Sequence, residues 1–199
     1  MARKQIEVRL NTLATPEMIE REDFDVVIAA IGGTPVMPDL PGIEHASMNV
    51  YSVFQNEAKL GRNVVVIGGS AVPAEAAVYL ARTGHTVTEI SRKNIVAYEL
   101  NPIRERGNVN RFSCQCGVHH IRSAKTVRLE AGRVWYQATD GTICTVACDD
   151  IVCGGLVPKR DEAMVFFGSA PEFYAIGNCK ENGSMRTAIF DAYGLCMNI

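Results

Sequence analysis

Residues 64–84, VVVIGGSAVPAEAAVYLARTG, constrain the fold more than any other part of the sequence. They open with four β-branched apolar residues, a run too short for a helix and suited to a strand buried on both faces. A turn follows at Gly68 and Gly69, and from Ala71 apolar residues recur at helical spacing until Gly84, which is placed to end the helix. This order of strand, glycine turn and helix is typical of the phosphate-binding corner of a dinucleotide-binding α/β fold.

The glycine turn departs from the G-x-G-x-x-G pattern, whose three glycine positions hold Gly68, Ser70 and Pro73. Only the first position matches. The Ser70 hydroxyl can itself donate to a phosphate, and a proline in the first helical turn removes an N–H group that costs little there. Two interpretations therefore stay open: a diphosphate site and a buried βα unit that binds nothing. In the first, the phosphate meets backbone amides around residues 69–72 at the positive end of the helix. The cofactor-binding residues expected here are Gly68, Gly69, Ser70, Ala71 and Val72.

The next predicted strand, residues 85–91, ends where such folds contact the ribose of the nucleotide. A carboxylate at this place would bind the 2′-hydroxyl of NAD. The sequence instead has Ser91, Arg92 and Lys93, which suit a 2′-phosphate, so NADP is favoured slightly over NAD. The alternative is that these cations form an ordinary solvated strand end.

Composition excludes several classes of partner. The 199 residues are 47% hydrophobic, enough for a substantial core, and the formal net charge of -2 argues against nucleic acids and anionic membranes. No apolar run approaches the length of a membrane span, and no signal-peptide pattern precedes residue 5. The 7 cysteines are scattered, which favours reduced thiols in a cytoplasmic protein.

The remaining segments predict further strands and a closing helix. Residues 24–31 read as a buried strand, residues 118–147 as four antiparallel strands joined by turns, and residues 149–153 as another buried strand. Residues 184–199 carry apolar side chains on one helical stripe. That stripe leaves an exposed apolar surface, so a homo-oligomer stays possible.

Four segments in order resemble a known family. FDVVIAAIGGTPVMPDLPGI resembles the "ATG-x-x-P" strand and exit of flavoproteins with two dinucleotide-binding domains, and NVVVIGGSAVPAEAAVYLARTGHTV resembles their NAD(P)H-binding corner. DDIVCGGLVPK resembles a second strand exit, and FYAIGNCKENGSMRTAIFDAYGLCMNI resembles the ending that meets the FAD ribityl chain. Together they are similar to the C-terminal region of NADH:flavin oxidoreductases related to old yellow enzyme, a group that includes 2,4-dienoyl-CoA reductases, enoate reductases and trimethylamine dehydrogenase.

The resemblance implies an α/β fold: a three-layer ββα FAD/NAD(P)-binding, Rossmann-like domain with an antiparallel β-meander. It implies an intact nucleotide domain over residues 63–157, with residues 1–62 and 158–199 as the remainder of a truncated FAD domain. The cofactors are NADP or NAD, with FAD only in the intact enzyme, and the partner is the flavin-bearing remainder of that enzyme. We expect this chain alone to bind FAD weakly or not at all, and to be inactive by itself.

The resemblance adds site residues to those of the glycine turn. Glu75 matches an acidic residue common in the nucleotide corner, and Asn178 stands where the FAD-contacting ending usually has aspartate. The cofactor-binding residues expected from the two strand exits and these matches are Glu75, Cys153, Gly154, Gly155, Gly177 and Asn178. None is catalytic, because the cofactors carry the hydride chemistry.

The spacing of the cysteine and histidine residues argues against a redox-active disulfide and against a zinc site. The sequence has no Cys-x-x-Cys pair, which argues against disulfide reductase activity. A zinc site among Cys114, Cys116, His119 and His120 is disfavoured, because neighbouring residues on a strand point to opposite faces. Two functions remain: a nucleotide-binding portion of an NAD(P)H:flavin oxidoreductase, and a degenerate, non-catalytic domain kept for architecture or subunit contact.

Overall fold

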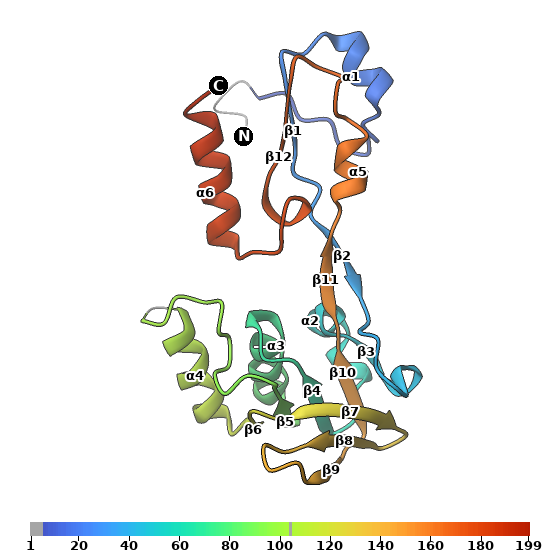
Figure 1. Ribbon diagram of the computed structural model, residues 1–199, viewed down its shortest axis with the longest axis vertical. Helices are drawn as coiled ribbons and strands as arrows, with labels where there is room; N and C mark the ends of the chain where they lie inside the picture. The colour runs from blue at the N-terminus through green and yellow to red at the C-terminus, as the bar shows by residue number, and fades with distance from the viewer. Residues whose placement is uncertain (1–5, 104) are drawn as a thin grey trace. The chain divides into compact units, whose positions relative to one another are not determined.

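The computed structural model describes residues 6–103 and 105–199 and divides them into two compact units (Figure 1). One unit is Pro35–Leu156; the other joins the described part of Met1–Thr34 to Val157–Ile199. The first unit is larger than the 63–157 domain expected from the sequence. Residues 35–62 belong to it because Val50, Val53 and Leu60 lie in the same buried cluster as Val64.

The larger unit is built on a parallel sheet of five strands. Their order is β3 (Met48–Asn49), β10 (Asp150–Cys153), β4 (Asn63–Ile67), β5 (Thr86–Ile90) and β6 (His119–Ile121). Helix α3 (Ala71–Arg82) connects β4 to β5, and α4 (Glu105–Cys116) precedes β6. Short helical segments are η2 (Ile43–His45), η3 (Val50–Ser52), α2 (Val53–Asn56) and η4 (Glu57–Lys59).

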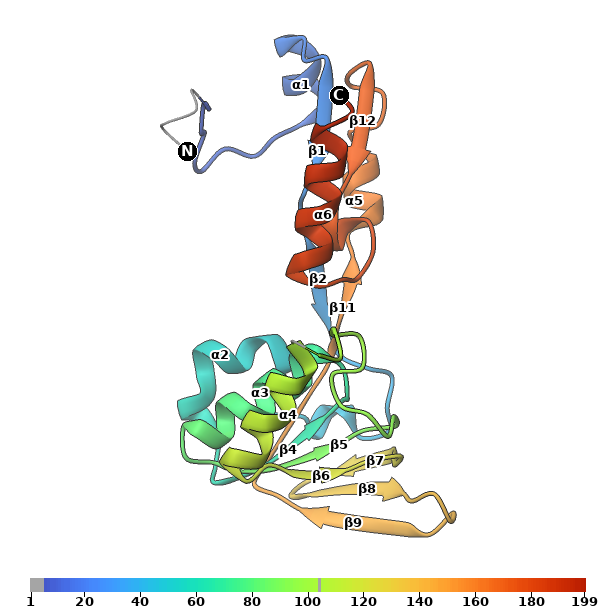
Figure 2. The same cartoon turned by 90° about the vertical axis from the view of Figure 1, so that its left-hand side faces the viewer.

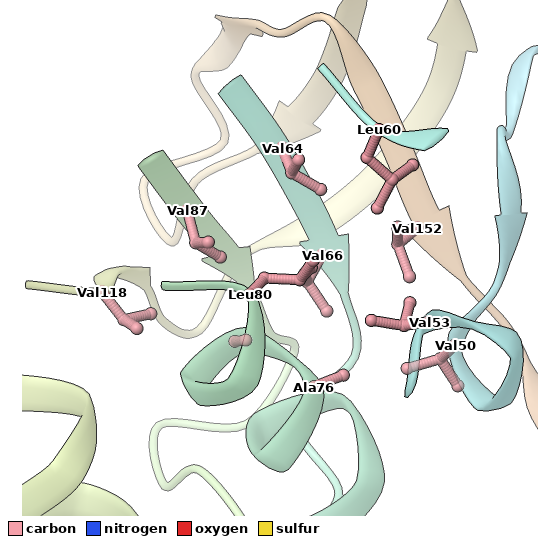
Figure 3. Close-up of a cluster of buried hydrophobic side chains, with 11 residues drawn as sticks. Val50, Val53, Leu60, Val64, Val66, Ala76, Leu80, Val87, Val118 and Val152 are labelled. Atoms are coloured by element: carbon pink, nitrogen blue, oxygen red, sulfur yellow. The ribbon is translucent and has the colours of Figure 1, made fainter. Parts of the chain in front are cut away.

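Alternation along β4 creates two cores, one on each face of the sheet. Val64 and Val66 point toward α3 and pack with its buried Leu80, as Figure 3 shows. Val65 faces the other way, into a cluster with residues of an antiparallel sheet of β7 (Lys125–Glu130), β8 (Arg133–Gln137) and β9 (Ile143–Ala147). Helices, parallel sheet and meander thus form three layers (Figure 2), which confirms the predicted ββα architecture.

The strand β6 corrects one expectation and explains a polar core residue. It was expected as the first of the antiparallel strands, but it pairs in parallel with β5, and the antiparallel sheet begins at Lys125. Glu89 is buried within β5, where an apolar residue is normal. Its register partner on β6 is His120, whose Nδ1 lies 2.6 Å from Glu89 Oε2, so the carboxylate is paired inside the sheet.

The smaller unit contains β1 (Val26–Ala29) in parallel with β12 (Glu172–Ala175), α1 (Pro16–Glu22), α5 (Arg160–Met164), η5 (Gly177–Cys179) and α6 (Met185–Cys196). Thr15 caps α1 by accepting from the Met18 N–H group. Strand β1 is only partly buried, and α6 has no buried residue, so this unit leaves large apolar side chains exposed.

Two short strands connect the units. They are β2 (Gly33–Val36) and β11 (Gly155–Pro158), and they pair with each other. In the part of the chain that the structure describes, no helix is both long and apolar enough to span a bilayer.

Candidate functional site

The turn after β4 requires glycine at its first position. Gly68 has φ +139°, and a Cβ there would lie 2.6 Å from Pro73 Cγ. The Gly68 N–H group donates to the Ile90 carbonyl at 3.0 Å, which ties the turn to the end of β5. The buried Pro73 ring thus occupies the space beside the turn that the third glycine of the pattern leaves empty.

Gly69 brings the turn against the tip of β5. A Cβ at Gly69 would overlap Ser91 Oγ and lie 2.8 Å from Ser91 Cβ, so no side chain fits. The Gly69 carbonyl accepts from the Ala97 N–H group at 2.7 Å. Gly69, Ser91 and Ala97 therefore fix three segments of the larger unit close together.

The start of α3 has few backbone amides available for an anion, although helix N-termini favour negative charge. Ser70 is its N-cap in extended conformation, and the Ser70 hydroxyl makes no capping hydrogen bond. Pro73 has no N–H group, and the Ala71 N–H group donates to Glu99 Oε1 at 2.7 Å. Sequence reasoning missed this Glu99 contact, because Ala71 and Glu99 are 28 positions apart.

A pocket of about 680 Å³ joins this turn to the tip of β5. Six of the predicted cofactor-binding residues line it: Gly68, Gly69, Ser70, Ser91, Arg92 and Gly154. Pro73 is also part of the lining, so the proline forms a wall and the turn stays open to the pocket. Sequence reasoning missed a group of lining residues from other segments: Asp39, Leu40, Tyr98, Lys125 and Thr126.

The pocket has a cationic side made by two segments. Arg92 and Lys93 follow β5, and the Ala124 N–H group donates to the Ser91 carbonyl at 2.9 Å, which places the start of β7 beside them. Lys125 therefore joins Arg92 and Lys93 in the lining. Three cations favour a phosphate-bearing ligand at this end of the pocket.

Several predicted residues lie outside the lining. Ala71 and Val72 begin α3, and Glu75 stands one turn further along the helix. The pKa of Glu75 is raised, first by partial burial and then by the negative charges of Glu99 and Glu105. Glu75 and Glu99 thus stand near the start of α3, whereas Arg92, Lys93 and Lys125 line the pocket together with Asp39.

The second strand exit contributes one lining residue. Cys153 is fully buried at the end of β10, and burial raises the pKa of its thiol to about 11. Gly154 has φ +131°, and a Cβ there would overlap the Asn49 amide. Gly155 begins β11 and does not line the pocket.

Gly177 and Asn178 belong to the other unit. Both lie in η5, where the Gly177 N–H group donates to Asp191 Oδ2 at 3.3 Å. Asn178 Oδ1 accepts from the Gly183 N–H group at 3.0 Å, so it orders the loop before α6.

The described cysteines form no disulfide, and the two histidines of β6 differ in burial. All seven cysteines are free thiols. His119 is exposed on β6, whereas the neighbouring His120 is largely buried against Glu89. The two imidazoles thus point to opposite faces, as expected for neighbours on a strand.

Comparison with known proteins adds to this geometry. Residues 3–165 match the family described as pyridine nucleotide-disulphide oxidoreductase. The chain is 26% identical over 196 residues to bilirubin reductase of Mediterraneibacter gnavus (strain CC55_001C), covering 97% of this chain and 30% of that protein.

Solved structures of two other enzymes share the fold of this chain. A 2-naphthoyl-CoA reductase complex is 27% identical with a TM-score of 0.85, covering 98% of this chain and 30% of the other. Histamine dehydrogenase from Rhizobium sp. 4-9 is 15% identical with a TM-score of 0.76, covering 95% and 31% respectively, and shows the fold. The resemblance to the old-yellow-enzyme-related group is thereby confirmed. The chain spans about a third of the length of these relatives.

Proposed function

The chain belongs to the pyridine nucleotide-disulphide oxidoreductase family, and from this premise we propose that its pocket holds a reduced nicotinamide dinucleotide for hydride transfer to a flavin. The observation that carries the proposal is that the glycine turn after β4 and the cationic end of β5 line one pocket. Gly68 and Gly69 both line the pocket, and the turn needs them because a Cβ at either position would collide with Pro73 or Ser91. The N-terminus of α3 adds favourable electrostatics.

The adenosine ribose lies beside Ser91 in this proposal, with its 2′-phosphate against Arg92, Lys93 and Lys125. These cations favour NADPH over NADH, since a carboxylate at the strand tip is the usual partner of an unmodified ribose. The Ser70 hydroxyl, free of any capping bond, donates to the diphosphate.

The chain's own residues position the cofactor and exclude side reactions. When bound, the nicotinamide supplies a hydride and the flavin of the intact enzyme accepts it. Of the second strand exit, Gly154 lies beside the nucleotide in this proposal, because it lines the pocket whereas Cys153 and Gly155 do not. The Cys153 thiol stays protonated near neutral pH, because its pKa is raised to about 11, and takes no part in the transfer.

Calorimetric titration with NADPH and NADH tests the proposal. We expect micromolar binding of NADPH and weaker binding of NADH, with the preference reduced in Arg92→Ala. Arg62→Ala is the matched control, because Arg62 is exposed at the opposite end of β4. No heat from either nucleotide at millimolar concentration contradicts the proposal.

One observation favours a second candidate, a degenerate domain kept for architecture or subunit contact. Two of the three glycine positions hold Ser70 and Pro73, and the first amide of α3 already donates to Glu99. This candidate predicts no nucleotide binding in the wild type, and partial binding in Pro73→Gly.

A further inference from the structure

Glu99 places a negative charge at the N-terminal end of α3, where the diphosphate is expected. Its Oε1 accepts from the N–H group of Ala71, the first residue of the helix, at 2.7 Å. Because Pro73 offers no N–H group, the helix end has few amides with which to bind a second anion. A carboxylate and a diphosphate therefore compete for the same donor.

The backbone around Glu99 is fixed, whereas its side chain is exposed. Val96, Ala97 and Leu100 are buried in one cluster with Ala74 of α3, and the Ala97 N–H group holds the Gly69 carbonyl at 2.7 Å. Glu99 lies between these anchors on the solvent side. Its carboxylate can thus leave Ala71 by side-chain rotation alone, without movement of the segment.

The charge of Glu99 acts on its surroundings. It contributes to the raised pKa of Glu75, after the larger effect of partial burial and together with Glu105. Arg92, Lys93 and Lys125 line the pocket, whereas Glu99 stands outside its lining, at the Ala71 amide. The ionised Glu99 therefore opposes the arrival of a diphosphate at the helix end.

Resting on the proposed function, we infer that Glu99 is an internal anion that closes the diphosphate position, and that a dinucleotide binds only after this side chain swings into solvent. Glu99 thus sets the affinity of the site without contacting the bound nucleotide. It acts on the diphosphate, which NADPH and NADH share, and so it weakens the binding of both to the same extent.

Calorimetry with NADPH and NADH on three forms of the full chain tests this inference. Glu99→Ala removes the competing acceptor, and Glu99→Gln keeps a weaker, neutral one. We expect both nucleotides to bind about tenfold more tightly to Glu99→Ala, a change equal to about 1.4 kcal/mol, with Glu99→Gln intermediate. Glu44→Gln, which removes an exposed carboxylate elsewhere in the same unit, leaves the affinities unchanged.

The outcomes separate the two proposals. Equal affinity in the wild type and Glu99→Ala overturns the competition and leaves the proposed function standing. No binding by any form at millimolar nucleotide overturns both. Hydrogen exchange at the Ala71 amide gives an independent readout, because it should quicken in Glu99→Ala; an unchanged rate contradicts the contact itself.

Discussion

Gly69 lies so close to Ser91 that the loss of stability caused by a side chain at position 69 can be estimated. Gly69→Ala places a Cβ 2.8 Å from Ser91 Cβ and over its Oγ, so rotating the hydroxyl cannot relieve the overlap. Overpacking of this kind costs about 1–3 kcal/mol. The φ angle of Gly69 is not in the left-handed region, so the backbone adds no strain of its own. We expect a loss of about 2 kcal/mol in the free energy of unfolding.

Ser91→Gly should rescue Gly69→Ala, because it removes both atoms that the new methyl group meets. Alone it costs about 1 kcal/mol, from the lost acceptor for the Lys93 N–H group and the added chain entropy of glycine. The double variant should therefore be no less stable than Gly69→Ala, with a coupling energy of at least about 1 kcal/mol.

Urea unfolding followed by the fluorescence of Trp135 measures this cycle. Trp135 is the one tryptophan of the sequence and lies on β8 of the same unit. With a slope of about 2 kcal/mol/M, the loss in Gly69→Ala lowers the midpoint by about 1 M. Strictly additive effects in the double variant, or an unchanged midpoint in Gly69→Ala, would refute the packing argument.

Three further predictions concern buried or partly buried titratable groups. Glu89→Gln replaces the carboxylate beside His120 with a neutral amide, and should cost about 1–3 kcal/mol in urea unfolding because the histidine loses a charged hydrogen-bonding partner inside the sheet; an unchanged free energy of unfolding would argue against the pairing. The raised pKa of Glu75 means that the folded chain retains a proton that the unfolded chain releases, so stability falls as pH rises above the ordinary glutamate pKa. Glu75→Gln should therefore gain stability relative to the wild type between about pH 4 and about pH 7, and an unchanged difference in unfolding free energy would contradict this. Cys153, with its pKa near 11, should react with iodoacetamide at about pH 8 far more slowly than the exposed cysteines, as peptide mass mapping would show.

Local sequence patterns predicted the elements that depend only on residues close together in the sequence. The apolar run of β4 and the alternation of β7 to β9 each depend on neighbouring residues, and the structure confirms them. Strand β6 was assigned to the wrong sheet because apolar and polar residues alternate in the same way in two kinds of strand. One is a half-buried parallel strand at a sheet edge, and the other is an antiparallel strand. The limits of the larger unit were missed because Val50 and Val53 join its core through tertiary packing alone.

The candidate site was predictable in its glycine turn, in the tip of β5 and at Gly154 after β10. Gly68, Gly69 and Ser91 follow strands directly, and the carboxyl ends of neighbouring parallel strands meet at one edge of a sheet. Lys125 lines the pocket because of a backbone hydrogen bond between Ala124 and Ser91, and Glu99 reaches the Ala71 amide with its side chain. Both contacts join segments far apart in the sequence, so they leave no local pattern. The pairing of Glu89 with His120 depends likewise on the register of two strands.

We propose that backbone amides at one turn receive the diphosphate of a nicotinamide dinucleotide. Amide chemical shifts recorded during titration of the ¹⁵N-labelled chain with NADPH test this most directly. We expect the largest changes at Gly69, Ser70, Ala71 and Val72, with further changes at Arg92. Saturable binding that leaves those four amides unmoved, or no shift at millimolar NADPH, would contradict it.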